Sequence, residues 1–587
     1  MHKIKSIVYL LISPLFLFGQ IQLQSINQKN FSFAILGDRT GSAEPEIFEQ
    51  IIKTTIKLNP DFVMNIGDLI EGYASDIDSI NAQWDSIFSN LGYLKDKFYF
   101  TPGNHDIWDD QSEIIYLTRL GYKNPYYTFS IGKNHFIVLD NSRQAKINDL
   151  DSAQIKWLNT TLNKFKKTDN IFCFMHRSFW KDAYNTNKPD TFHKLFVKYG
   201  VDYVFSGHDH FYCQLNWDGI TYTQLGPSGS RYKVYREKEF GAFQNFLVVS
   251  VKKNKPTIKV IEPDGTELAP DIVTMADIKE LVKIDKSILI SAINPYQADS
   301  ISVEIKNILE ISISTQCQWS INNNAWQIIP NQHSVMIAPQ NIYTYRYYVS
   351  LKSDSIYPLP NFQMTYPYAA GKKDYNLSRM VPIALDAECH LVNEIVKIDG
   401  NLTEKAWKAK KPISVFGSSE GKLSPTDPWQ CWFAYDKDYI YISARLIDSL
   451  PDKISLTITK RDDRVNADDH INVILQPNVA SDTYYQFFIN ANGAIWDRIC
   501  YQQGKEQKRD TKWNSNIIAK TKIIKDSKFS GWVVEAAIPF KDFNITKPNQ
   551  VWGFNLVRYQ KRKETVSIYS VPFEHDPKTF ARLNFIK

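Results

Sequence analysis

The chain has 587 residues, of which 43% are hydrophobic and 22% charged, a composition that excludes a mainly disordered or collagen-like protein. Because single cores stop growing at about 250–300 residues, we expect about three domains. A net charge of +6 is too small over this length to favour nucleic-acid binding, so no nucleic-acid partner is expected.

The N-terminus predicts an export signal. Lys3 and Lys5 precede an apolar run over residues 7–18 that is broken by Pro14. A positive start before a short apolar stretch is typical of a secretory signal peptide, and the run is short for a membrane span. We expect a signal peptide over residues 1–20, a secreted or periplasmic protein and no stable membrane span; an uncleaved anchor helix is the alternative.

The next block, residues 28–265, alternates short apolar runs with helix-like stretches, which is typical of an α/β domain. Five of the apolar runs lead into polar residues that suit a metal ion. These polar segments are 37–41, 67–68, 103–106, 176 and 207–210. Ligands gather at the carboxyl ends of strands in α/β sheets, so we expect the five strand ends to meet in one site.

The residue types in these segments fit one another chemically. Carboxylates, an amide oxygen and imidazoles form a mixed oxygen and nitrogen set that suits Mn, Fe or Zn. Two such cations about 3.5–4 Å apart activate a water molecule and clamp the oxygens of an in-line displacement at phosphorus. The pattern therefore indicates a two-metal centre that acts on phosphate esters.

These ordered motifs resemble the calcineurin-like metallophosphoesterase superfamily over roughly residues 28–265. The motifs are Gly37-Asp38, Gly67-Asp68, Gly103-Asn104-His105-Asp106, His176 and Gly207-His208-Asp209-His210. The resemblance implies a four-layer αββα sandwich that holds two divalent metal ions and hydrolyses a phosphate mono- or diester substrate.

The resemblance also assigns roles to individual residues. The six metal ligands it implies are Asp38 and His210 for the first metal, Asp68 as the bridge, and Asn104, His176 and His208 for the second. His105 would steady the phosphate and protonate the leaving oxygen. Asp106 would orient His105 by accepting a hydrogen bond from its ring.

One position departs from the family pattern, which usually has Asp-x-His where this chain has Asp38-Arg39-Thr40. Glu71 could replace the missing imidazole or be an ordinary loop carboxylate, and Thr40 could leave room for water. Either way, the first site could be weaker or prefer another metal. Arg39 could bind the substrate phosphate as a bidentate donor or be a solvated charge, and Arg231 could line the pocket or be structural.

Two further blocks read as β-structure. Residues 285–368 contain strict apolar–polar alternation over 301–306 and end in a proline-bearing stretch, 357–360. This pattern predicts a small Ig-like β-sandwich that acts as a spacer. Before it, residues 271–286 read as a polar linker with one short helix.

Residues 384–587 form the last block and resemble the family 9 carbohydrate-binding module superfamily, a β-sandwich. The resemblance rests on diffuse motifs at 398–407, 433–436, 439–442, 468–471, 531–539 and 552–555. Aromatic planes stack on the apolar faces of sugars, so a glycan or envelope polymer is a possible partner. The candidate stacking residues are Trp429, Trp432, Trp496 and Trp513, each of which could equally be core.

Thr40 also motivates a rival function. In this alternative the chain retains the metallophosphoesterase fold but has weakened or lost catalysis, and it acts as a secreted glycan-binding protein. The cysteines leave a separate question open, because export permits disulfides and Cys389, Cys431 and Cys500 could pair.

Overall fold

The computed structural model describes residues 26–587 apart from 75, 409–410, 504–505 and 573–574. The chain divides into two compact units, the first ending at Val282 and the second beginning at Lys283. The predicted signal peptide lies outside the described residues. Within the described residues, no helix is both long enough and apolar enough to cross a membrane.

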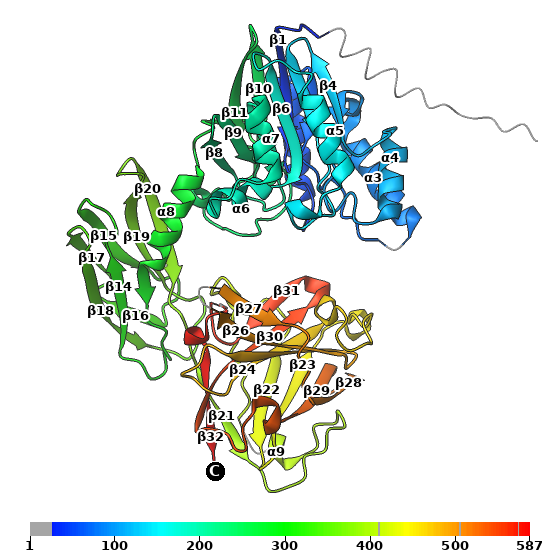
Figure 1. Ribbon diagram of the computed structural model, residues 1–587. Helices are drawn as coiled ribbons and strands as arrows, with labels where there is room; N and C mark the ends of the chain where they lie inside the picture. The colour runs from blue at the N-terminus through cyan, green and yellow to red at the C-terminus, as the bar shows by residue number, and fades with distance from the viewer. Residues whose placement is uncertain (1–25, 75, 409–410, 504–505, 573–574) are drawn as a thin grey trace, which may run out of the picture. The chain divides into compact units, whose positions relative to one another are not determined.

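The first unit contains two six-stranded sheets (Figure 1). The strand order is β12-β11-β10-β1-β2-β3 in one sheet and β4-β5-β6-β7-β9-β8 in the other. The strands are β1 (Asn30–Leu36), β2 (Phe62–Asn65), β3 (Phe98–Tyr99), β4 (Tyr127–Ile131), β5 (Asn134–Val138), β6 (Asn170–Arg177), β7 (Tyr203–Gly207), β8 (Cys213–Trp217), β9 (Ile220–Gln224), β10 (Phe246–Lys252), β11 (Lys255–Ile261) and β12 (Glu267–Leu268). Parallel pairing of β1 with β2 and of β6 with β7 brings their carboxyl ends to the same edge.

Helices follow β1, β2, β3, β5 and β6 along the chain. They are α2 (Pro45–Leu58), α3 (Ile77–Leu91), α4 (Asp110–Leu120), α5 (Ser152–Leu162), α6 (Phe179–Asn185) and α7 (Thr191–Tyr199). A further helix, α8 (Met275–Lys286), confirms the short helix predicted in the linker.

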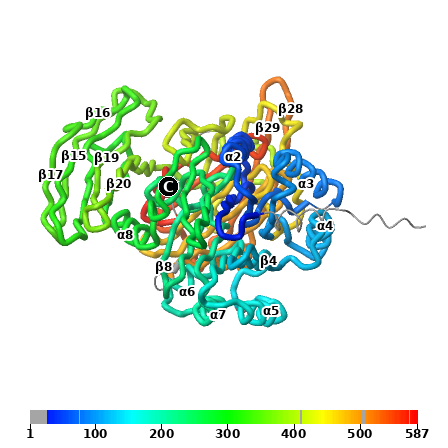
Figure 2. Tube along the Cα trace, turned by 90° about the horizontal axis from the view of Figure 1, so that it is seen from above, coloured from blue at the N-terminus to red at the C-terminus, as the bar shows by residue number. Residues whose placement is uncertain are grey.

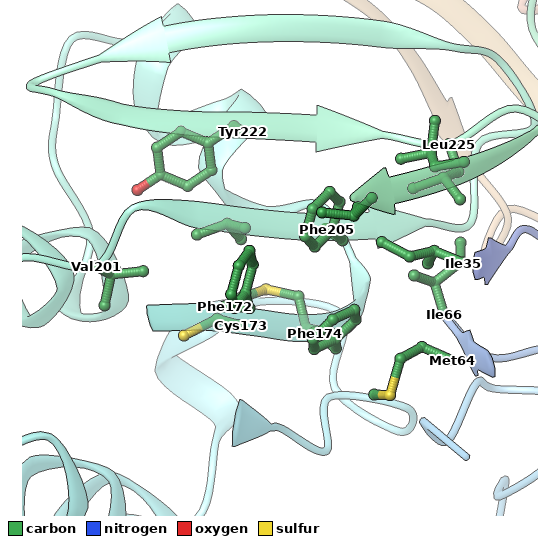
Figure 3. Packing of buried hydrophobic residues seen from close by; sticks show 14 of the residues in the cluster. Ile35, Met64, Ile66, Phe172, Cys173, Phe174, Val201, Phe205, Tyr222 and Leu225 are labelled. Atoms are coloured by element: carbon green, nitrogen blue, oxygen red, sulfur yellow. The ribbon is translucent and has the colours of Figure 1, made fainter. Parts of the chain in front are cut away.

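Alternation along β1 explains the layering. Phe33 and Ile35 lie in the apolar cluster between the two sheets. Figure 3 shows Ile35 of this cluster with Phe172 and Phe205 of the other sheet. Leu36, on the opposite face of β1, belongs to a second cluster with residues of α2, α3 and α4. Because successive side chains of a strand point to opposite faces, one strand supplies both cores. The predicted α/β sandwich is confirmed.

The second unit begins with a sandwich of two four-stranded sheets. The first sheet contains β13 (Ile288–Ile290), β14 (Ser300–Lys306), β18 (Ile342–Leu351) and β16 (Trp326–Ile329). The second contains β17 (Gln332–Ile337), β15 (Ile313–Ser320), β19 (Asn361–Tyr368) and β20 (Lys373–Met380), which Figure 2 shows side by side. The sandwich thus extends beyond the predicted end at residue 368, since Tyr375 and Leu377 alternate inward along β20.

A twelve-stranded sheet fills the rest of the second unit. Its strands are β21 (Asp386–Leu391), β22 (Trp429–Tyr435), β23 (Tyr439–Ile447), β24 (His470–Gln476), β25 (Tyr484–Asn490), β26 (Ile495–Gln503), β27 (Glu506–Asp510), β28 (Ile518–Lys525), β29 (Ser530–Pro539), β30 (Val551–Gln560), β31 (Thr565–Ile568) and β32 (Ala581–Ile586). A short helix, α9 (Lys405–Lys408), precedes β22.

The sheet folds over on itself. Phe433 of β22 and Phe554 of β30 are separated in strand order by β21 and β32, which would put them roughly 14 Å apart in a flat sheet. Their ring centroids lie 5.4 Å apart. The two halves of the sheet therefore face each other across an apolar core, as predicted for a β-sandwich.

All six cysteines are buried and unpaired. The possible disulfides among Cys389, Cys431 and Cys500 are not formed. Burial raises the pKa of the Cys389 thiol well above its usual value. These thiols therefore act as small apolar core residues.

Candidate metal centre

The structure brings the predicted ligands together from both sheets of the first unit. Asp38 follows β1, Asp68 follows β2 and Asn104 follows β3, all in one sheet, whereas the ligands from the other sheet lie at the end of β6 and just after β7. Across the two sheets, His210 Nε2 lies 3.1 Å from Asp38 Oδ2. His176 Nε2 lies 3.2 Å from Asp68 Oδ2. The five strand ends therefore form a single cluster.

Four residues form the group assigned to the second metal. His176 Nε2 lies 3.0 Å from Asn104 Oδ1 and 3.1 Å from His208 Nδ1. Asp68, His176 and His208 offer ligand atoms that all lie within 4.8 Å of one another. Three of the four residues are buried, and His208 is half-buried. One divalent cation fits this arrangement of oxygen and nitrogen donors.

The group assigned to the first metal has unsatisfied atoms. Asp38 Oδ1, Asp68 Oδ2, His210 Nε2 and Thr40 Oγ1 are all buried without a hydrogen-bond partner in the described part of the chain. Buried polar atoms are normally hydrogen-bonded. A cation would satisfy the carboxylates and the imidazole, so the donor set fits a second ion.

Backbone carbonyls set the tautomers of two ligand histidines. His176 Nδ1 donates to the Ile66 carbonyl at 2.9 Å, and His210 Nδ1 donates to the Arg231 carbonyl at 2.6 Å. Each neutral ring then has its lone pair on Nε2, which is the atom that faces the carboxylates. Such contacts behind a ligand orient it and increase its basicity.

The loops that carry the ligands are strained and tightly packed. Asp68, His208 and His210 have φ angles of 58°, 78° and 55°, a left-handed conformation that is unfavourable for residues other than glycine and is found mainly at functional sites. A Cβ atom on Gly103 would lie 2.2 Å from Asp68 Oδ1, and one on Gly207 would lie 2.3 Å from Asp38 Oδ1. Glycine is required at both positions because the ligands occupy that space.

The ligand group has a distinctive charge distribution. Burial alone would raise the pKa of Asp68, but His176 reverses this effect and holds that pKa well below its usual value. Burial alone would lower the pKa of His176, and Asp68 outweighs it, so this pKa is raised. Burial, reinforced by His176 and nearby cationic side chains, lowers the pKa of His208 to about 2. His208 is therefore neutral, as a metal ligand must be.

The predicted role of Asp106 as the residue that orients His105 is wrong. Both oxygens of Asp106 accept backbone N–H groups, among them that of Asp68 at 2.7 Å and that of Gly103 at 2.9 Å. His105 Nδ1 instead donates to the carbonyl of Glu71 at 2.6 Å. Asp106 fixes the loop that presents Asp68, and burial together with the Asp68 charge raises the pKa of Asp106 to about 6.

The two arginines predicted to bind substrate point elsewhere. Arg39 Nη1 donates to the Leu69 carbonyl at 3.1 Å, and its guanidinium lies 5.7 Å from the centre of the Phe48 ring. The Arg231 side chain is 60% exposed and pairs with Glu44 at 3.7 Å. In this conformation both have structural partners.

Glu71 does not supply the first metal group with a donor that the structure identifies. The residue is exposed, and its backbone carbonyl holds the His105 ring. Thr40 is buried within the loop, where its backbone N–H donates to the Asp68 carbonyl at 3.1 Å. The loss of the family's usual imidazole at position 40 is therefore not visibly compensated by Glu71.

Sequence reasoning missed several residues that support the site. The carboxamide oxygen of Asn141 accepts from the backbone N–H groups of His176 and Arg177, each at 3.0 Å. Tyr73 accepts a hydrogen bond from Asn104 Nδ2 at 3.1 Å. The segment 139–142 follows β5 directly. It is thus a sixth strand end with polar residues, and that signal could have identified Asn141.

The candidate sugar-binding tryptophans of the second unit differ in exposure. Trp429 is buried, stacks on Phe416 with ring centroids 4.0 Å apart and donates to Ser567 Oγ at 2.9 Å. It is a core residue. The other three candidates are half-buried and could still present a ring edge or face.

Two matches to family models define the class of this protein. Residues 31–212 match the calcineurin-like phosphoesterase family, and residues 398–579 match the carbohydrate family 9 binding domain-like family. The chain therefore combines a calcineurin-like phosphoesterase domain with a family 9 carbohydrate-binding-like domain, and both predicted resemblances are confirmed. No curated protein sequence matches this chain.

Several solved structures match one domain each. A dimetal phosphatase from Danio rerio shares 13% identity, covers 40% of this chain and 98% of its own, with a TM-score of 0.32. A family 9 carbohydrate-binding module from Caldicellulosiruptor kristjanssonii, solved with glucose, shares 13% identity, covers 34% and 95%, and has a TM-score of 0.24. GAP50, the anchor in the inner membrane complex of Plasmodium, shares 16% identity, covers 40% and 85%, and has a TM-score of 0.30.

Proposed function

We propose that this protein is an exported, metal-dependent phosphoesterase that hydrolyses a phosphate mono- or diester and carries a carbohydrate-binding appendage. The observation that carries the proposal is the convergence of Asp38, Asp68 and His210 atoms that are buried and unsatisfied beside a second group of ligands. Such an arrangement is costly unless cations complete it.

Two divalent cations at these groups would supply an activated water and polarise the phosphoryl oxygens. The residues of the chain would hold these ions in place. Asp38 and His210 would hold one ion, Asn104, His176 and His208 would hold the other, and Asp68 would contribute to both. Asp106 would keep the Asp68 loop in place through its backbone hydrogen bonds.

His105 is the proposed general acid. Its ring is half-buried, and Nδ1 is held by the Glu71 carbonyl, which leaves Nε2 without a protein partner in the described part of the chain. When the ring is protonated, Nε2–H can donate to the leaving oxygen. Water adds to phosphorus, the P–O ester bond breaks, and the leaving oxygen takes the proton that His105 held.

The proposal is tested with the purified full chain, loaded separately with Mn, Zn or Fe. Bound metal is measured by mass spectrometry, and turnover is measured with an aryl phosphate monoester and an aryl phosphate diester. We expect two equivalents of metal and turnover of at least one ester, both lost in His208→Ala. His333→Ala, a half-buried histidine of the small sandwich, is the matched control. Absence of turnover with every metal would contradict the proposal.

A second candidate function is a secreted glycan-binding protein with weakened catalysis. The observation that favours it is Thr40, which is buried where relatives usually have an imidazole ligand. One equivalent of metal or none, together with saturable binding to a glycan array, would support this candidate. Two equivalents with turnover would reject it.

The export component has its own test. N-terminal sequencing of the protein recovered from a secreting host should begin near residue 20 if the signal peptide is cleaved. Recovery of the intact N-terminus in the membrane fraction would indicate the uncleaved anchor instead.

A further inference from the structure

Arg177 directly follows a metal ligand and lies against another. Its backbone is held on both sides by Asn141, which accepts from its N–H at 3.0 Å and donates to its carbonyl at 2.8 Å. Its Nε donates to the Ser142 carbonyl at 3.2 Å. Its Nη1 lies 2.9 Å from His208 Nε2. The guanidinium is therefore fixed at the edge of the second metal group.

No carboxylate of the described residues forms an ion pair with this guanidinium, although the Asp68 carboxylate is near enough to act on it electrostatically. Arg177 is half-buried. Of the other cationic side chains nearby, Lys181 pairs with Asp209 and Arg231 pairs with Glu44, whereas Lys233 Nζ donates to the His208 carbonyl at 3.1 Å. A partly desolvated charge is costly when it is unpaired. An anion supplied from outside the chain would remove that cost.

The contact with His208 uses only part of the guanidinium. Arginine only donates, so His208 Nε2 accepts from Arg177 Nη1. The guanidinium has five N–H donors, so donors remain for an anion after its contacts with His208 and with the Ser142 carbonyl.

We propose that Arg177 binds a non-bridging oxygen of the substrate phosphate and makes the site favour monoesters over diesters. This inference rests on the proposed function. A monoester offers three non-bridging oxygens and up to two negative charges, whereas a diester offers two such oxygens and one charge. A guanidinium without a carboxylate partner gains more from the dianion, since it donates in a charge-assisted, bidentate geometry.

The first test measures binding of inorganic phosphate to the metal-loaded full chain by calorimetry. We expect Arg177→Gln to weaken phosphate binding by about 10–100-fold, the range for a lost charge-assisted hydrogen bond, with metal content unchanged. Arg177→Lys should recover part of the phosphate affinity, because it keeps the positive charge but not the paired N–H donors of the guanidinium. Arg143→Gln is the matched control, since Arg143 is paired with Asp110 and Glu113, and it should bind phosphate as the wild type does.

The second test compares kcat/KM for aryl monoester and diester substrates. In Arg177→Gln the monoester value should fall at least about 10-fold more than the diester value. Equal losses for both esters, or unchanged phosphate affinity, would overturn the inference. If Arg177 were merely structural, Arg177→Gln would lower the thermal midpoint or metal content while Arg177→Lys kept the wild-type ester ratio. A wild type that binds no metal and turns over no ester would reject the proposed function itself, whereas an active wild type with unaltered variants rejects only the role of Arg177.

Discussion

Two buried polar clusters, one in each domain that matches a known family, differ in how far their charged groups are paired. In the C-terminal domain, Arg558 is fully buried and donates to the carbonyls of Asp427 at 2.7 Å and Ile447 at 2.6 Å, and only its Nε has no hydrogen-bond partner among the described residues. The Asp448 carboxylate beside it accepts from Gln560 at 2.7 Å and Arg562 at 2.9 Å. In the N-terminal domain, Asp38 Oδ1, Asp68 Oδ2 and His210 Nε2 are also buried, and none of these three atoms has a hydrogen-bond partner in the described part of the chain.

This difference distinguishes a polar cluster that stabilises the fold from one that is suited to bind a ligand. Groups that satisfy one another lower the free energy of the folded chain and need nothing from outside. Groups that converge without partners raise it, and such sites persist where a ligand completes them. The Arg558 network is therefore expected to serve stability, and the Asp68 centre is the proposed metal site.

The strongest test of the comparison is Asp68→Asn. The amide keeps the shape of the side chain but removes the charge between the two ligand groups. We expect bound metal to fall below two equivalents and turnover to fall by at least about 100-fold, which exceeds the usual effect of a residue behind the ligands. Metal analysis and ester hydrolysis are the measurements. Asp482→Asn, at an exposed site in the other domain, should change neither.

For Arg558→Met we expect a loss of stability and no change in metal binding. Removal of this buried cation leaves backbone carbonyls and nearby carboxylates without a donor, so the free energy of unfolding should drop by about 3–5 kcal/mol. Denaturant unfolding measures the loss, and metal content should be unaffected. Arg582→Met, on an exposed position of β32, should stay within about 0.5 kcal/mol of the wild type. A small effect at Arg558 would show that its network is not structural.

Acidification should weaken the C-terminal domain through His470. This residue is 7% exposed, its Nδ1 lies 2.9 Å from the Asp468 carbonyl, and burial lowers its pKa from 6.5 to about 4. The unfolded chain then binds more protons between these pH values, so the unfolding free energy falls as pH decreases from 6.5 to 4, by about 3 kcal/mol. Urea titrations at several pH values measure this fall in the unfolding free energy. His470→Gln should flatten this profile; an equal slope in the variant would contradict the assignment.

The smallest expected effect is that of Tyr73→Phe. The change removes only the hydroxyl that accepts from Asn104 and leaves the ring packed on His105 at 5.0 Å. Loss of one such hydrogen bond costs about 1 kcal/mol, so the second metal should bind about 5-fold more weakly in a competition with a chelator. Tyr93→Phe is matched in exposure, 52% against 51% for Tyr73, and should leave metal affinity unchanged.

Much of the fold followed from local pattern. Strict alternation over 301–306 corresponds to β14 (Ser300–Lys306), and the apolar runs before Asp38 and His208 are β1 and β7. The predicted end of the sandwich at residue 368 is too early, because the prolines at 358 and 360 precede β19 and a further strand, β20, follows it. Proline marks a break in hydrogen bonding, and a break between two strands looks the same in sequence as the end of a domain.

The sequence by itself determined which residue types stand at the strand ends and in which order. Ligand chemistry depends on the identity of each residue, and the positions of the glycines can be read directly. Only the tertiary structure decided what lies behind each ligand. The Glu71 carbonyl rather than Asp106 holds His105, and Arg177 lies against His208. Backbone carbonyls are the same at every position, and contacts between the two sheets depend on how strands distant in the chain are packed. Neither therefore leaves a local signature in the sequence.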